Sequence, residues 1–255
     1  MCITSCRSTP HSTPPPLSTI SRSVNIWSLQ HQLIKLPRLQ NDAAPPQNWP
    51  ADVAYLTRPR LSPSFPPELV PLLSAGSKFA PRPSTHPSTL SIKTVTTTGH
   101  PALGQRSLVA RKRLEPKSLL LPYLGIVHAD FSDAAGQRVD RHGAQTACAH
   151  EGSDYDLSLM RLSASDVRNP FGAHALQGEE EKALHVSIGV DAAQAGNAAR
   201  FVNDFRGVAA APNAEFRLGR GEEGEARMEV WSTRRIEKGD EVLVSYGKGW
   251  WGARK

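Results

Sequence analysis

Prolines are distributed very unevenly: sixteen of the 21 in this 255-residue chain fall before residue 90. The same segment is rich in serine and threonine and poor in aromatic residues. Polar, proline-rich sequence cannot bury enough apolar surface to offset the entropy lost on ordering. We therefore predict that residues 1–88 form a disordered extension and that residues 89–255 form one folded domain. Apolar pieces at 24–36 and 68–73 are candidates for short docking turns within the extension.

Basic charge is concentrated in the same N-terminal segment. Residues 1–90 carry eight lysines and arginines against three acidic residues, whereas residues 91–255 carry 22 against 21. The folded part is thus nearly neutral, which argues against a direct nucleic-acid-binding fold. The first 40 residues contain no acidic residue, as transit peptides do; a plain disordered tail is the alternative. No apolar run reaches the roughly 18 residues of a membrane span, so we expect no membrane partner.

Cysteine usage points to reduced thiols in an intracellular protein. Cys2, Cys6 and Cys148 are too few for a disulfide framework, and their spacing suits no metal site. The histidines near Cys148 do not follow ligand spacing either. We therefore expect no bound metal.

Beyond residue 89, short apolar runs are interrupted by glycine and proline. Four of these runs predict strands: residues 90–96, 119–127, 154–159 and 184–190. Residues 214–218 and 227–231 flank a loop rich in glycine and glutamate, which predicts a β-hairpin. Many short strands with irregular connections predict a β-rich domain with little helix.

Two segments of the C-terminal half carry the residues most suited to chemistry. Residues 196–205 read Gly-Asn-Ala-Ala-Arg-Phe-Val-Asn-Asp-Phe, and residues 241–247 read Glu-Val-Leu-Val-Ser-Tyr-Gly. Glycine, asparagine and aspartate in the first suit turns and capture of backbone groups. The second is an apolar strand ending in Tyr246, which sets a hydroxyl at a defined position rather than filling space.

In order and spacing, these segments resemble the signature motifs of the SET domain, the family of S-adenosylmethionine-dependent protein lysine methyltransferases. The family's usual form is Arg-Phe-Ile-Asn-His-Ser, then Pro-Asn, then Glu-Leu-x-x-Asp-Tyr-Gly; here Pro212-Asn213 stands between the two segments. The resemblance covers residues 90–255. It implies several small curved sheets and a knot-like threading of the C-terminal segment. It also implies S-adenosylmethionine as cofactor and a protein lysine, on a histone tail or another protein, as substrate.

The resemblance also assigns roles to particular residues. Tyr246 and Tyr123 match the catalytic tyrosines. The cofactor-binding positions are Gly104, Arg106, Ser107, Leu108, Arg200, Phe201, Asn203, Asp204, Tyr246 and Trp251. The substrate channel falls to Tyr123, Phe205, Val244 and Tyr246. We expect a monomer in the nucleus or cytoplasm, with the mitochondrion as the alternative that the acid-free N-terminus suggests.

The chemistry explains why tyrosines suit such a channel. A free lysine has a pKa of about 10.4, and methyl transfer needs its neutral amine. An apolar channel and a nearby sulfonium cation both disfavour the ammonium form. Tyrosine rings can line the channel, and their hydroxyls can orient the amine without carrying charge.

Three positions depart from the family pattern. Asp204 replaces histidine, Phe205 replaces serine, and Ser107 stands where the second loop glycine is expected. A positive φ at Ser107 would cost about 1 kcal/mol or more and weaken donor binding. The alternative function is therefore a catalytically weakened SET-fold binding module. A further alternative is an adaptor acting through the proline-rich tail.

The carboxylates of Asp154, Asp156 and Asp191 are a candidate set for acid–base work. They are scattered over predicted strands and turns, and we favour a structural role for them.

Overall fold

The computed structural model describes residues 39–74, 88–147, 150, 152–175 and 182–247. The chain divides into two units, residues 1–37 and 38–255, and all described residues belong to the second. This unit is β-rich, as predicted, with short helical turns such as η3 (Ala173–Ala175) and η4 (Ala198–Phe201). Among the described residues, no helix is long and apolar enough to cross a membrane.

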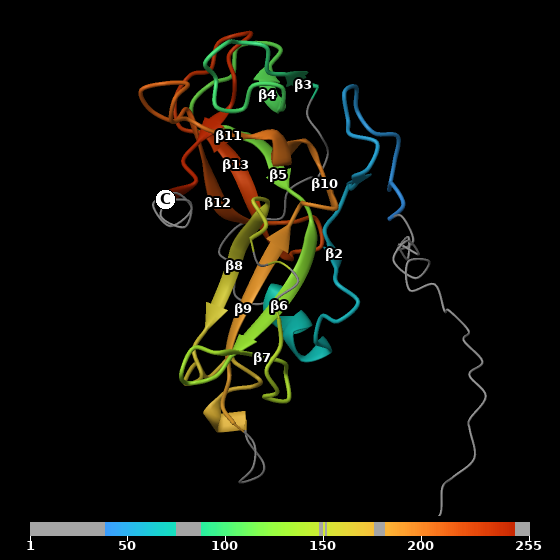
Figure 1. Ribbon diagram of the computed structural model, residues 1–255, viewed down its shortest axis with the longest axis vertical. Helices are drawn as coiled ribbons and strands as arrows, with labels where there is room; N and C mark the ends of the chain where they lie inside the picture. The colour runs from blue at the N-terminus through green and yellow to red at the C-terminus, as the bar shows by residue number, and fades with distance from the viewer. Residues whose placement is uncertain (1–38, 75–87, 148–149, 151, 176–181, 248–255) are drawn as a thin grey trace, which may run out of the picture. The chain divides into compact units, whose positions relative to one another are not determined.

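The largest sheet has the strand order β2-β6-β9-β8, with β7 added beside β6 (Figure 1). Its strands are β2 (Arg60–Leu61), β6 (Ile126–Ser132), β7 (Arg138–Val139), β8 (Asp156–Leu162) and β9 (His185–Asp191). β9 runs antiparallel to both β6 and β8, and its Gly189 pairs with His128 of β6 and with Ser158 of β8. β9 therefore lies between β6 and β8 and brings His128, near the start of β6, close to the start of β8.

A second sheet has the order β12-β13-β5, from β5 (Leu119–Tyr123), β12 (Ala214–Arg220) and β13 (Ala226–Ser232). β12 and β13 form the predicted hairpin. The apolar run at 119–127, predicted as one strand, supplies parts of two strands, β5 and β6. The break falls at Gly125, where a Cβ atom would collide with the Asp191 carbonyl group. The chain can turn between the sheets there because glycine has no side chain.

Three pairs of short strands complete the fold. β3 (Leu90–Thr94) and β4 (Arg106–Ala110) are antiparallel. β1 (Ala54–Tyr55) pairs in parallel with β10 (Ala195–Gly196). β11 (Asn203–Asp204) pairs in parallel with β14 (Leu243–Val244), so the two motif segments lie side by side. The knot-like threading of the C-terminal segment stays a prediction.

The prediction of disorder up to residue 88 is wrong for residues 39–74. This segment contributes β1, β2, η2 (Pro67–Leu69) and α1 (Val70–Ser74). Its Leu56 and Leu69 side chains are fully buried. Its strands are only two residues long and pair with β10 and β6, which lie far along the chain. Such long-range pairing leaves no local periodicity to detect. The predicted turn at 24–36 lies outside the described residues, as do 1–38 and 75–87.

A buried ion pair lies on β13. Arg227 and Glu229 are 2% and 1% exposed, and their side chains meet at 2.8 Å. The Trp231 indole donates a 2.9 Å hydrogen bond to the second carboxylate oxygen of Glu229. On the neighbouring strand, Gly219 leaves the space that this carboxylate fills. Removing one partner of such a pair would leave an uncompensated buried charge, which is strongly destabilising.

Candidate functional site

The two motif segments border a cavity of about 690 Å³. Loop 100–106, the end of β5, the start of β8, strand β11 and residues 245–246, which follow β14, all contribute to its wall. Eight residues assigned to the site from the sequence line this cavity: Gly104, Arg106, Tyr123, Arg200, Phe201, Asn203, Asp204 and Tyr246. Segments more than a hundred residues apart therefore form one pocket.

Tyr246 is held by both its hydroxyl and its backbone. Its hydroxyl donates a 2.8 Å hydrogen bond to the Val202 carbonyl oxygen, and its backbone N–H donates to Asp204 Oδ2 at 2.8 Å. Burial raises the pKa of the Tyr246 phenol above its ordinary value, and the Asp204 charge adds to this rise. The group is therefore a neutral phenol at physiological pH.

Tyr123 ends β5 and is 4% exposed. Its hydroxyl donates a 2.7 Å hydrogen bond to the Tyr155 carbonyl oxygen. Burial raises the pKa of the Tyr123 phenol well above its ordinary value, although the Arg200 guanidinium opposes this shift. The cavity thus has two neutral phenols whose hydrogens are donated to backbone carbonyls, and their oxygens can still accept.

Asn203 connects the two sides of the pocket. Its amide nitrogen donates to the Arg106 carbonyl oxygen at 3.3 Å and to Glu241 Oε1 at 2.7 Å. With both amide hydrogens used in this way, the amide oxygen is the group that can accept from a ligand.

Asp204, which stands in place of the family's histidine, has a clear structural role. Its carboxylate accepts from the backbone N–H groups of Tyr246 and Arg206, each at 2.8 Å. It also forms a 2.9 Å ion pair with the Arg206 side chain. The substitution therefore fixes the backbone that carries Tyr246.

The backbone of the loop before β4 shows whether Ser107 is strained. Gly104 has a φ of +81°, and it is the residue that needs glycine's freedom here. Ser107 lies within β4, paired with Lys93 and 3% exposed, and it is not among the residues with positive φ. The predicted strain at Ser107 is therefore wrong, because the strand has already begun at Arg106.

Several other predicted residues lie away from the pocket wall. Ser107, Leu108 and Val244 are buried in the core. The guanidinium carbon of Arg206 lies over the Phe205 ring, 4.9 Å from the ring centroid. Phe205 does not line the cavity. Their placement does not support direct contact with donor or lysine. Trp251 lies outside the described residues.

Sequence reasoning missed part of the wall. Tyr155 lines the cavity with its ring beneath Arg200, 4.2 Å from guanidinium carbon to centroid. Its alternating neighbours indicated a strand, and only the carboxylates of Asp154 and Asp156 on either side of it were considered for a site; both also line the cavity. His100 and Arg206 also line the cavity, and no motif singled them out.

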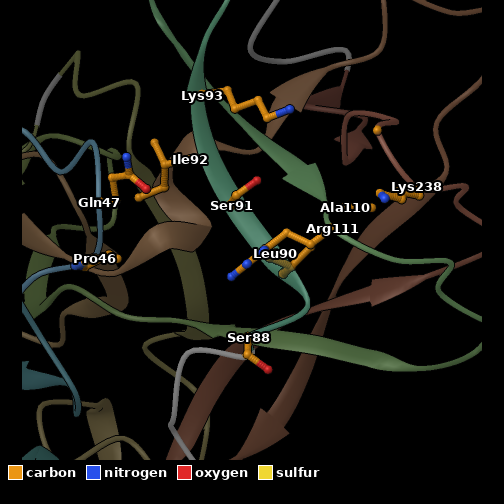
Figure 2. A pocket seen from close by; sticks show the side chains of 11 residues that line it. Pro46, Gln47, Ser88, Leu90, Ser91, Ile92, Lys93, Ala110, Arg111 and Lys238 are labelled. Carbon is orange, nitrogen blue, oxygen red and sulfur yellow. The ribbon is translucent and has the colours of Figure 1, made fainter.

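A second cavity of about 600 Å³ lies around β3 (Figure 2). The basic side chains Lys93, Arg111 and Lys238 belong to its wall, with Pro46 and Gln47 across the strand. It contains neither phenol nor Asn203, so it is not the candidate site.

A fold of small sheets that joins these two segments over a pocket with two phenols defines the SET class of domains. A family model described as "SET domain" matches residues 105–247, which is more than half of the chain. The chain belongs to the SET domain family.

A search of solved structures finds matches that include the Chaetomium thermophilum polycomb repressive complex 2, at 18% identity and a TM-score of 0.37. That match covers 62% of this chain and 15% of the other. The ATXR5 SET domain in complex with histone H3 dimethylated on R26 matches at 16% identity and a TM-score of 0.36, covering 62% of this chain and 57% of the other. The chain thus spans less than two thirds of the length of each of these two solved chains. Among curated proteins, no sequence matches.

Proposed function

We propose that the protein is an S-adenosylmethionine-dependent protein-lysine N-methyltransferase. One observation carries the proposal: the neutral phenols of Tyr246 and Tyr123 border the same cavity as Gly104 and Asn203. In the family these are the parts that face the donor's methyl group and hold the donor. A protein lysine is the substrate class that the family implies.

The pocket suits the donor in size and in polarity. Its volume of about 690 Å³ falls in the usual range for small-molecule sites, about 300–1,000 Å³. Its wall carries cationic Arg106 and Arg200 together with anionic Asp154, which suits the ammonium and carboxylate groups of an amino-acid moiety. When bound, the donor would supply a methyl group on a positively charged sulfur.

The chain's own residues would prepare the lysine. Desolvation between the Tyr123 and Tyr246 rings lowers the pKa of an entering amine and favours its neutral form. Both phenols donate to backbone carbonyls, so their oxygens can accept N–H hydrogens and aim the amine's lone pair. Alignment of the reacting atoms is worth several orders of magnitude in rate.

The test is transfer of radiolabelled methyl from S-adenosylmethionine to an array of lysine peptides that includes histone tails. Tyr246→Phe should lower the rate about 100-fold or more, because the orienting oxygen is lost. Tyr55→Phe is the matched control, since Tyr55 is 7% exposed and does not line the cavity. An undiminished rate in Tyr246→Phe would contradict the assigned role.

Calorimetry on the wild-type protein addresses the alternative. Heat on titration with S-adenosylmethionine is expected for the enzyme. No heat, together with no methyl transfer, would favour a SET-fold binding module without turnover.

A further inference from the structure

Two histidines outside the proposed chemistry stack on one another. His128, on β6, is 4% exposed, and its ring lies 3.7 Å from that of His150, with 16° between the planes. Three carboxylates surround the pair. His128 Nε2 lies 2.9 Å from Asp156 Oδ1, and His128 Nδ1 lies 3.0 Å from Asp130 Oδ2. His150 Nδ1 lies 2.8 Å from Asp191 Oδ2.

The strand between these groups leaves space for their contact. Gly189 of β9 lies opposite His128 in the sheet. A Cβ atom at Gly189 would fall 2.5 Å from His128 Nε2 and 2.8 Å from Asp156 Oδ1. Glycine weakens a strand interior, and there it often marks the close approach of another group. Here its absent side chain lets an ion pair cross from β6 to β8.

From the histidine pair, hydrogen bonds lead to the channel tyrosine. Asp191 Oδ1 accepts from the Ser153 hydroxyl at 2.9 Å, and that hydroxyl accepts from the Tyr155 N–H at 3.2 Å. The Tyr155 carbonyl oxygen then accepts from the Tyr123 hydroxyl at 2.7 Å. Asp156, the next residue, is held by His128. Both histidines therefore fix the same short segment, residues 153–156.

We propose that the stacked pair of His128 and His150 positions residues 153–156 and, through the Tyr155 carbonyl, sets the direction of the Tyr123 hydroxyl in the lysine channel. His128, His150 and Ser153 would thus be positioning residues. This inference rests on the proposed methyl transfer. A small misdirection of an orienting group is enough to slow a reaction that depends on alignment.

The charges around the pair give the arrangement a pH dependence. His128 faces Asp130 on its own strand, Asp156 on β8, and His150, which is paired with Asp191. Burial lowers the pKa of His128, but the adjacent carboxylates of Asp130 and Asp156 outweigh burial and raise the value to about 9. His128 therefore remains a cation at neutral pH, and its hold on Asp156 weakens as the pH rises through about 9.

The experiment compares Ser153→Ala and His150→Gln with wild type. We expect kcat to fall five- to tenfold, about the effect of one lost hydrogen bond. The Kd for S-adenosylmethionine should stay unchanged. Ser153→Thr, which keeps the hydroxyl, should restore kcat. Ser163→Ala is the matched control, because that exposed hydroxyl follows the far end of β8 and bonds only to Ser165 in the described part of the chain.

A wild-type kcat in both Ser153→Ala and His150→Gln would overturn the inference. If the wild-type protein shows no turnover, the proposed function fails and a second measurement decides the inference. The signals of ¹³C-labelled tyrosine, with Tyr123 assigned from Tyr123→Phe, should then shift in Ser153→Ala and His150→Gln but not in Ser163→Ala. An unmoved Tyr123 signal would overturn it as well.

Discussion

The side-chain amide of Asn203 donates a 2.7 Å hydrogen bond to one carboxylate oxygen of Glu241, whose other oxygen lies 3.1 Å from His100 Nε2. One carboxylate thus ties the second motif segment to the first and to the loop that precedes Gly104. With its amide nitrogen donating in this way, Asn203 has its amide oxygen as the group that can accept from a ligand. We expect the proposed donor pocket to depend on this carboxylate, because it joins all three segments.

Glu241→Ala should therefore weaken donor binding. Loss of hydrogen bonds to a charged acceptor frees both Asn203 and His100, and we expect the Kd for S-adenosylmethionine to rise about tenfold or more, as measured by calorimetry. Glu237→Ala is the matched control on the same turn, where the glutamate is exposed. Equal affinities in the two variants would show that the Glu241 contact is dispensable.

Ser107→Gly should not improve donor binding. Ser107 is already in extended β4, so glycine relieves no strain there. Glycine in a strand interior costs about 0.5–1 kcal/mol relative to alanine. We expect an unchanged Kd for the donor and a free energy of unfolding lower by about 1 kcal/mol, measured by urea denaturation. A tighter donor complex would reinstate the strain hypothesis.

The Arg227–Glu229 pair should be far more sensitive to truncation than an exposed pair on the same hairpin. Arg227→Ala leaves a carboxylate buried and unpaired, and we expect a loss of about 3–5 kcal/mol in the free energy of unfolding. Arg217→Ala is the control. It removes the partner of Glu215 on β12, where both side chains are more than 40% exposed, and should cost less than about 1 kcal/mol. Similar losses of unfolding free energy in Arg227→Ala and Arg217→Ala would contradict the greater cost that we assign to breaking the buried pair.

Protonation of His128 should make stability depend on pH. Its pKa is about 9 in the folded protein, above the ordinary value of about 6.5. The stabilisation is therefore complete below about pH 6.5 and is lost as the pH rises through about 9. Between these limits, the stability advantage of wild type over His128→Asn should shrink by about 3 kcal/mol at most. Chemical denaturation of both proteins from below pH 6.5 to above pH 9 measures this change, and a constant difference would contradict the prediction.

The sequence predicted which residues share the pocket better than it predicted where strands and loops begin. Asn203 and Tyr246 lie in segments whose order is itself informative, so they could be assigned without coordinates. Tyr155 could not be assigned, because it precedes β8 and its place in the wall depends on tertiary contacts, such as its ring beneath Arg200. Ser107 was misjudged because a shift of one residue decides whether a position lies in a loop or in a strand.

The stacked histidines were missed for a related reason. His128 and His150 are 22 residues apart in the chain, and their contact depends on the pairing of β6 with β9 and on a glycine in the strand between. No spacing rule for metal ligands or nucleophiles describes such a pair. The hairpin, by contrast, was predicted because its signal is local.

β1 pairs with β10 and β2 pairs with β6. The cooperative folding unit is therefore larger than residues 105–247, the part that matches the family model. A fragment trimmed to residues 105–247 would lose these partners and leave a hydrophobic hollow where Leu56 and Leu69 are buried. Open strand edges beside exposed apolar surface favour self-association. We therefore expect the fragment 105–247 to aggregate when it is expressed alone. A fragment that begins at residue 39 keeps β1 and β2 and should be more soluble.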